Sequence, residues 1–204
     1  MKYNSIEDVI SFIEKWTGQV FLNSNQSQLP SFMPDALHTL DKALGSFWER
    51  PPFPFEPGEL DHNSKRGLFH VQDEIVNPRT VDINADVIPL VYENQGVFCF
   101  GYNQELELMI TGDWSFNGRY VSMEDWEPFP ADIEDVLSCF LLSNFFIYMQ
   151  ANNNFISKKD SEEFLEQCPI VLWSHSAMGE SCKVLTDNSA KMLLIIGLGA
   201  IVRG

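Results

Sequence analysis

Two apolar runs separated by a short polar turn constrain the fold of this chain more than any other feature. The runs span residues 87–92 and 97–102, and the residues between them read Glu-Asn-Gln-Gly. Asn94 and Gly96 adopt positive φ readily, which suits a tight connection between antiparallel strands. Residues 97–100, Val-Phe-Cys-Phe, are apolar on both faces. We therefore predict a β-hairpin whose second strand lies at the centre of a sheet.

The residues after this hairpin predict further strands. Residues 105–110 alternate between acidic and apolar types, which is typical of a half-buried strand. We expect Leu106, Leu108 and Ile110 to face inward, and Glu105 and Glu107 to face outward. Other strands are expected at 119–122, 170–173, 182–186 and 192–202.

Helical spacing of apolar residues predicts three longer helices, at 6–16, 34–44 and 131–150, and a shorter one at 161–167. Ser5 is the expected N-cap of the first helix, and Gly18 its end. The expected core stripe of the third long helix is Ile133, Val136, Leu137, Phe140, Leu141 and Ile147. The pattern predicts an α+β fold with a central, mostly antiparallel sheet of five to six strands. We expect helices on one side of that sheet and a C-terminal helix and strand extension.

Length and composition fit one domain with a large core. The chain has 204 residues, of which 45% are hydrophobic and 13% aromatic. Its start has no apolar signal segment, and the longest apolar run, 192–202, is shorter than the roughly 20 residues of a membrane span. We interpret that run as a buried strand with a bend, and we expect a cytoplasmic protein without membrane contact. The cysteines form no CxxC pair and are expected to be reduced and buried: Cys99, Cys139, Cys168 and Cys182.

The chain is strongly acidic, and the acidity is concentrated in one segment. It has 13 Lys and Arg against 29 Asp and Glu, a net charge of −16. Residues 80–157 contain twelve acidic residues and one basic residue, Arg119, a net charge of −11. This charge has two interpretations, which are general solubility and an acidic face for a basic partner. Direct binding of nucleic acid is disfavoured because its phosphates would be repelled.

The sequence contains no motif for a metal, a cofactor or a catalytic site. It lacks a phosphate-binding loop, a dinucleotide fingerprint and a nucleophile elbow. The histidines have no partner at metal-ligand spacing: His38, His62, His70 and His175. Adjacent carboxylates are too numerous to mark a site: Asp73-Glu74, Glu124-Asp125 and Glu134-Asp135. We therefore predict no catalytic residue, no metal and no cofactor. A hydrolase that uses Ser174, His175 or a carboxylate pair is kept as an alternative.

The hairpin carries a resemblance to a known family. Residues 87–101, VIPLVYENQGVFCFG, resemble the central hairpin of the SUKH superfamily. In that motif an apolar strand leads into Glu-Asn-Gln-Gly-Val and then into an aromatic strand that ends in Trp-Gly, where this chain has Phe100. Neighbouring features follow in a similar order over about residues 28–150. The resemblance implies one SUKH-like domain over 1–204, in which 151–204 extend the same core.

SUKH proteins bind other proteins, and many bacterial members are thought to be immunity proteins that neutralise toxins, often nucleases. The resemblance implies such a function here, and the acidic segment adds a basic toxin domain as the expected partner. A regulatory or scaffolding module for endogenous proteins is the alternative from another class. The candidate partner-binding residues are Glu93, Asn94, Gln95, Glu105, Glu107, Asp113, Trp114, Glu124 and Asp125. Trp114, Phe116 and Trp126 are the candidate aromatic anchors.

Overall fold

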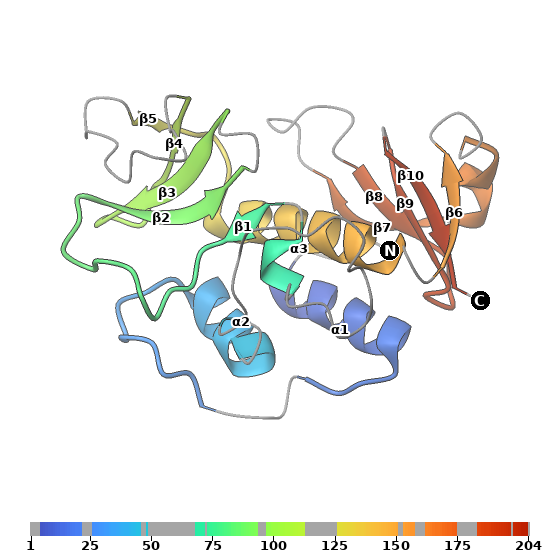
Figure 1. Ribbon diagram of the computed structural model, residues 1–204, viewed down its shortest axis with the longest axis horizontal. Helices are drawn as coiled ribbons and strands as arrows, with labels where there is room; N and C mark the ends of the chain where they lie inside the picture. The colour runs from blue at the N-terminus through green and yellow to red at the C-terminus, as the bar shows by residue number, and fades with distance from the viewer. Residues whose placement is uncertain are drawn as a thin grey trace, which may run out of the picture.

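The computed structural model describes residues 5–21, 26–45, 48, 68–71, 73–93, 97–112, 126–150, 153–157, 162–174, 183–196 and 198–203. Within these residues the fold is α+β, as predicted, with three α-helices and two antiparallel sheets of five strands each. Figure 1 shows the sheets at opposite ends of the molecule, with α3 (Ile133–Gln150) running between them. Helices α1 (Ile6–Thr17) and α2 (Asp35–Leu44) lie together beside α3 (Figure 1).

Helix α1 begins and ends where the sequence predicts. The Ser5 hydroxyl accepts a hydrogen bond from the Asp8 N–H at 3.3 Å, which satisfies one of the free donors of the first turn. Gly18 follows the last turn with φ +73° and donates its N–H to the Glu14 carbonyl at 2.8 Å. A left-handed glycine of this kind is a common helix end.

Helix α2 begins one residue later than predicted, because Pro34 occupies the N-cap position instead of the first helical position. Gly45 follows the helix with a right-handed φ of −58°, so positive φ is not the reason for a glycine here. The reason is a close approach, since a Cβ on Gly45 would lie 2.7 Å from Nη2 of Arg79. The predicted apolar stripe is buried: Leu37, Leu40 and Leu44.

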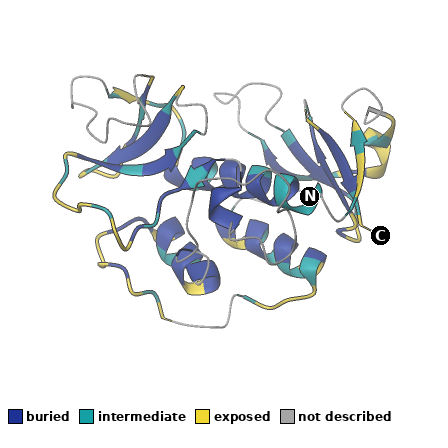
Figure 2. Ribbon diagram, in the orientation of Figure 1, coloured by how far each residue is buried: buried dark blue, intermediate teal, exposed yellow. Residues whose placement is uncertain are grey.

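Helix α3 is the centre of the core (Figure 2). The predicted stripe is buried except for Ile147, which is partly buried. Residues outside that stripe are buried as well, Phe145 and Phe146 among them, so the helix is covered on most of its circumference. The rings of Phe12 and Trp16 in α1 each lie 6.0 Å from Phe145, edge to face. These ring contacts hold α1 against α3.

Polar side chains of α3 fix the segments around it. The buried Asn144 amide accepts from the Asp73 N–H at 3.1 Å and donates to the Asp73 carbonyl at 2.9 Å. Both backbone groups of a buried residue are thereby satisfied. Glu134 accepts from the Ile6 N–H at 2.7 Å, and Asp135 accepts from the Trp173 indole at 3.2 Å. Acidic residues in the first turn of α3 thus bind neighbouring elements, in addition to their favourable position at the helix start.

Sheet 1 contains the predicted hairpin. Its strand order is β1-β2-β3-β4-β5, so β3 (Cys99–Asn103) is central, as predicted, but it begins two residues after the predicted Val97, which is 58% exposed. Strands β2 and β3 pair antiparallel, with an irregularity between Pro89 and Val91. The short 3-10 helix η2 (Leu68–His70) precedes the sheet. The strands are β1 (Glu74–Ile75), β2 (Val87–Tyr92), β3 (Cys99–Asn103), β4 (Leu108–Thr111) and β5 (Glu127–Pro128).

The strand predicted at 105–110 is wrong in its first half. Strand β4 begins at Leu108, and the residues before it form the turn that joins β3 to β4. Leu106, expected to face inward, has φ +63° and is 44% exposed. Leu108 is buried as predicted, and Ile110 is partly buried. The strand predicted at 119–122 lies outside the described residues.

Sheet 2 is formed by the C-terminal extension, with the order β6-β10-β9-β8-β7. The apolar run 192–202, predicted as one bent strand, is instead a hairpin of β9 and β10. The Leu198 N–H donates to the Ile195 carbonyl at 3.0 Å where the chain reverses. The elements are β6 (Asn154–Ser157), the 3-10 helix η4 (Glu162–Gln167), β7 (Ile170–Ser174), β8 (Lys183–Thr186), β9 (Met192–Ile195) and β10 (Gly199–Val202).

Three cysteines are free thiols and buried, as predicted: Cys99, Cys139 and Cys168. Cys182 lies outside the described residues. None of the helices in the described ranges has the length and apolar character that a membrane span requires.

Candidate protein-binding surface

The structure places the predicted site residues at two different ends of sheet 1. Glu93 follows β2 and lies where β3 begins, whereas Glu105 and Glu107 follow β3 at its other end. At about 3.4 Å per residue, the five residues of β3 separate these ends by roughly 17 Å. Glu93 therefore does not join the other two in one site. The remaining candidates lie outside the described residues: Asn94, Gln95, Asp113, Trp114, Glu124 and Asp125.

Glu93 has a structural role that the sequence did not reveal. Its carboxylate accepts from the Val97 N–H at 3.0 Å, and its own N–H donates to the Phe98 carbonyl at 3.2 Å. These bonds close the end of the hairpin between β2 and β3. A glutamate in such a position satisfies a turn donor, so its side chain is partly committed to the fold.

Trp126, one of the three candidate anchors, packs on sheet 1. A Cβ on Gly101 would lie 3.1 Å from the Trp126 ring and 2.6 Å from Cγ1 of Val87. Gly101 is therefore a position of close approach in the middle of β3. The half-buried indole covers this part of the strand, so packing accounts for much of its surface. Trp114 and Phe116 lie outside the described residues.

The turn between β3 and β4 is held by one side chain. The Asn103 amide oxygen accepts from the N–H groups of Glu105 at 3.0 Å and Glu107 at 2.9 Å. Its amide nitrogen donates to the Glu107 carboxylate at 2.9 Å. The Leu106 N–H donates to the Asn103 carbonyl at 3.1 Å. These bonds define one backbone conformation for the turn and hold Leu106 at positive φ.

A second segment lies beside this turn. The Gln104 side chain donates to the Ala85 carbonyl at 2.9 Å and reaches the Ile83 carbonyl at 3.5 Å. Val87, which starts β2, pairs with Asn103, which ends β3. Residues 82–86 and 103–107 therefore meet at the same end of sheet 1. Figure 2 shows the loop before β2 as exposed.

We call this end of the sheet the acidic corner and define it as Asp82, Ile83, Asp86, Glu105, Leu106 and Glu107. All six residues are exposed, and four of them carry a carboxylate. The two apolar members, Ile83 and Leu106, are 38% and 44% exposed. The corner thus combines negative charge with accessible aliphatic surface, a combination suited to contact with another macromolecule.

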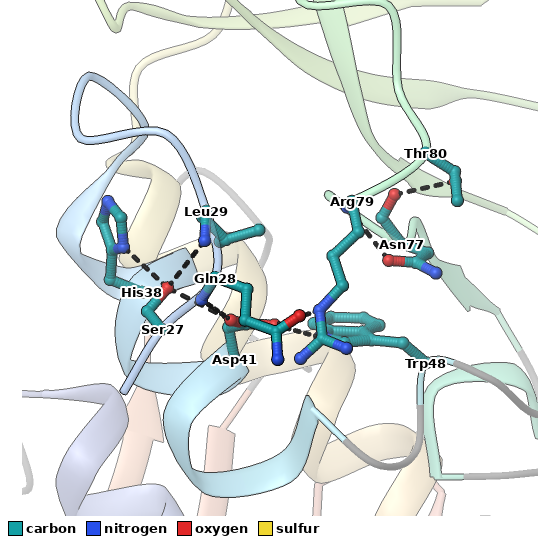
Figure 3. Close-up of polar contacts among 9 residues, drawn as sticks. All are labelled: Ser27, Gln28, Leu29, His38, Asp41, Trp48, Asn77, Arg79 and Thr80. Atoms are coloured by element: carbon teal, nitrogen blue, oxygen red, sulfur yellow. Dashed lines mark hydrogen bonds and ion pairs between the residues drawn. The ribbon is translucent and has the colours of Figure 1, made fainter. Parts of the chain in front are cut away.

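An ion pair between a buried aspartate and a partly exposed arginine anchors the segment that leads to the corner (Figure 3). The Asp41 carboxylate in α2 is fully buried and lies 2.8 Å from Nε of Arg79, in the loop that follows β1. It also accepts from the Trp48 indole at 3.1 Å and from the Gln28 N–H at 2.8 Å. Burial raises the pKa of Asp41, but the Gln28 N–H, Arg79 and Ser27 outweigh this effect and hold that pKa below its ordinary value.

The backbone around Arg79 is ordered by hydrogen bonds within the loop. The Asn77 side chain accepts from the Arg79 N–H at 3.0 Å, and the Thr80 N–H donates to the Asn77 carbonyl at 3.1 Å. Further along, the Asp82 carboxylate accepts from the Asn84 N–H at 3.0 Å. Successive side-chain bonds of this kind order a loop without a helix or strand. Residues 82–86 are therefore tied to the β3–β4 turn by Gln104, and the segment before them is anchored by Arg79.

Ser27, His38 and Asp41 lie together, but not in the order of a catalytic triad (Figure 3). The Ser27 hydroxyl lies between the other two, 3.1 Å from the Asp41 carboxylate and 2.9 Å from Nδ1 of His38. In a triad the histidine lies between nucleophile and carboxylate. The Ser27 oxygen also accepts from the Leu29 N–H at 3.2 Å. This arrangement fixes the chain before α2, and we assign it a structural role.

Other chemistry that the sequence suggested is not assembled within the described residues. Ser174 ends β7, where it pairs with Lys183, and His175 lies outside the described residues. No group of three or more His, Cys, Asp or Glu in the described ranges is arranged to hold a metal ion. Burial, and then the Glu74 charge, raise the pKa of the Cys99 thiol well above its ordinary value. Glu134 and Asp135 bind Ile6 and Trp173 separately.

Comparisons of the chain with protein-family models, curated proteins and solved structures gave no significant match. The acidic corner is accordingly interpreted from its own geometry and charge.

Proposed function

We propose that this protein is a binding domain that engages a basic protein partner through the surface around sheet 1 and α3. The observation that carries the proposal is the charge distribution. The described residues between 80 and 157 contain nine acidic side chains and no lysine or arginine. A surface whose charges are all negative raises the association rate with a positively charged partner and disfavours binding of negatively charged proteins.

Not all of these carboxylates are free to meet a partner. Glu93, Glu134 and Asp135 are engaged with the protein's own groups. The acidic corner supplies four exposed carboxylates on two ordered segments, of which Asp82 and Glu107 also accept hydrogen bonds from their own segments. Ordered segments lose little conformational entropy on binding, which favours the corner as the centre of the contact.

Among binding domains, we favour an immunity protein that neutralises a bacterial toxin, with a nuclease as the leading class. The resemblance of residues 87–101 to the SUKH hairpin motivates this choice, and the α+β fold with that hairpin in its first sheet is compatible with it. A nuclease must bind phosphates, so its working surface is basic. An acidic surface that covers it would block substrate by charge and by shape.

Co-expression with toxin domains encoded beside this gene tests the proposal. We expect protection of the host cell, and a complex whose affinity falls as salt is raised from about 50 to 300 mM because the charges are screened. The test variant is Asp86→Lys with Glu105→Lys, which reverses two exposed charges at the corner. The matched control is Glu163→Lys with Glu166→Lys, two exposed carboxylates of η4 beside sheet 2.

We expect the corner variant to bind at least about tenfold more weakly, and the η4 variant to bind within about twofold of the natural protein. Protection by the corner variant at the natural level would refute the assignment of the surface. A complete lack of protection and of complex formation with every adjacent toxin domain would refute the immunity function.

A further inference from the structure

Leu106 is an exposed aliphatic residue in a backbone conformation that disfavours it. Among the described residues other than glycine, only Leu106 and Ala190 have positive φ, at +63° and +53°. In this region the Cβ atom lies too close to the neighbouring backbone, which is unfavourable for an ordinary residue. Asparagine or glycine would occupy the position with less strain.

Ala190 shows what the same turn looks like when the strain is offset by packing. It lies three residues after Asp187 and donates its N–H to the Asp187 carbonyl at 3.3 Å, as Leu106 does three residues after Asn103. Ala190 is only 5% exposed and packs into the hydrophobic core, whereas Leu106 is 44% exposed. Much of the Leu106 side chain therefore lacks the burial that would compensate for its conformation.

Ile83 belongs to the adjoining segment of the corner and is also accessible, at 38%. The Gln104 amide, which bonds the carbonyls of Ala85 and Ile83, ties the two segments together. The corner therefore presents two aliphatic residues from two ordered segments. Scattered exposed aliphatic residues are common in proteins, but two on segments joined by hydrogen bonds, each with charged neighbours, resemble the apolar centre and polar rim of a contact site.

The charged residues next to Ile83 and Leu106 indicate what kind of partner could bind. Asp82, Asp86, Glu105 and Glu107 surround the aliphatic residues in the chain and are all exposed. A purely apolar partner would remove water from these carboxylates without replacing its hydrogen bonds, which is costly. A purely ionic partner would leave Ile83 and Leu106 in water. A surface that carries both cationic and aliphatic side chains satisfies both parts.

We propose that Ile83 and Leu106 are the apolar contacts of a docking site for a protein segment in which lysine or arginine side chains flank aliphatic ones. This inference rests on the proposed binding function and specifies its surface. The aliphatic residues supply affinity that persists at high salt, and the carboxylates supply orientation and rate.

Two synthetic peptides of equal length and charge test the proposal, one of alternating lysine and leucine and one of alternating lysine and serine. We expect the intact protein to bind the lysine–leucine peptide about tenfold more tightly at about 150 mM salt, as expected for burying one or two aliphatic side chains. The variant Leu106→Asn with Ile83→Ser should bind both peptides alike. Asparagine suits positive φ, so this variant should keep or raise its midpoint of thermal unfolding.

The matched control is Val97→Ser, which removes a side chain that is 58% exposed at the other end of sheet 1. It should keep the full preference for the lysine–leucine peptide. The inference fails if the intact protein binds both peptides equally, if the corner variant keeps the preference, or if Val97→Ser loses it. In those cases the proposed binding function still stands. If neither peptide binds at about 20 mM salt, the proposed function fails as well.

Discussion

Sheet 1 and sheet 2 share an architecture but differ in charge. Each has five antiparallel strands, and each contacts α3. Residues 80–157, which include four of the strands of sheet 1, the helix α3 and the edge strand β6 of sheet 2, have a net charge of −11. Residues 158–204, which include four strands of sheet 2, have five basic and six acidic residues, a net charge of −1. A sheet of this kind therefore folds without an acidic excess, so the acidity around sheet 1 is no requirement of the architecture, which is consistent with the proposed binding function.

The support of the two sheets differs as well. The loop that leads into β2 is anchored by the ion pair of Arg79 with the buried Asp41, which connects it to α2. The turn between β8 and β9 depends on Asp187, which accepts from the N–H groups of Lys191 at 2.7 Å and Met192 at 2.8 Å within its own turn. The loop before β2 is thus held by a contact between distant segments, and the turn between β8 and β9 by local bonds.

Removal of the Asp41 carboxylate should have the largest effect. Asp41→Ala leaves Arg79 without its partner and removes the acceptor of the Trp48 and Gln28 donors. The partly exposed Arg79 can be hydrated, but the buried Trp48 indole loses its acceptor and several charge-assisted bonds are lost, which costs about 2–4 kcal/mol. We expect a loss of that size in the free energy of unfolding, measured in urea. Asp35→Ala, an exposed acidic residue of the same helix, should cost under about 1 kcal/mol. A similar loss in both variants would contradict the central role of Asp41.

Acid should destabilise sheet 1 and the adjoining helix η2, because protonation of the buried His70 is unfavourable in the folded protein. This residue is buried in η2, neither ring nitrogen has a hydrogen-bond partner among the described residues, and burial lowers the pKa of His70 from 6.5 to about 4. The unfolded chain therefore binds a proton near pH 6.5, whereas the folded chain does so only near pH 4. Stability from the neutral ring is fully present above about pH 6.5 and is lost as the pH falls towards 4, by about 3 kcal/mol in total.

Urea unfolding at pH 7 and pH 5 measures this effect. His70→Gln should flatten the pH dependence in that range by about 2 kcal/mol, whatever its effect on stability at pH 7. Hydrogen exchange should show a larger loss of protection at pH 5 in β1 and β2 than in β8 and β9. An unchanged slope in the His70 variant would show that another group is responsible.

The β8–β9 turn is held by Asp187 and the β3–β4 turn by Asn103. They allow a direct comparison of a charged and a neutral hydrogen-bond acceptor. Asp187→Ala should cost about 2–3 kcal/mol, because a carboxylate that accepts several N–H bonds is lost. Asn103→Ala should cost about 1–2 kcal/mol, since its acceptor is a neutral amide. Chemical denaturation of both variants tests this order. If Asn103→Ala proved the more costly, the turn of sheet 1 would be better supported than its bonds indicate.

Local patterns in the sequence predicted most elements of the fold. The hairpin at 87–102, the caps of α1 and the extent of α3 follow from periodicity, turn residues and capping residues, which act over a few positions. The prediction was wrong where a side chain controls the backbone. Alternation favoured a strand at 105–110, but the hydrogen bonds of Asn103 close a turn there. The turn that divides 192–202 was missed for a similar reason, because the whole run is apolar.

The candidate site was less predictable than the fold. Glu105 and Glu107 were expected to face a partner, and both are exposed. Their neighbours Asp82, Ile83 and Asp86 were missed because Gln104 brings them close across about 20 positions of the chain. The contact between Asp41 and Arg79 spans 38 positions, and neither residue stands out in the sequence. The concentration of acidic residues in the sequence indicated the segment that contains the acidic corner. The arrangement of the corner residues depends on tertiary contacts, which local patterns do not show.

The smallest expected effect concerns the residues at positive φ. Leu106→Gly should raise the free energy of unfolding by about 0.5–1 kcal/mol, because strain is relieved and little buried surface is lost. Ala190→Gly relieves similar strain but removes a buried methyl group worth about 0.8 kcal/mol, so its net effect should be near zero. Thermal and urea unfolding of both variants measures the difference. A stabilised Leu106 variant with weaker partner binding would mean that the protein retains this leucine for contact and at the expense of stability. Destabilisation by Leu106→Gly would instead show that the side chain supports the fold.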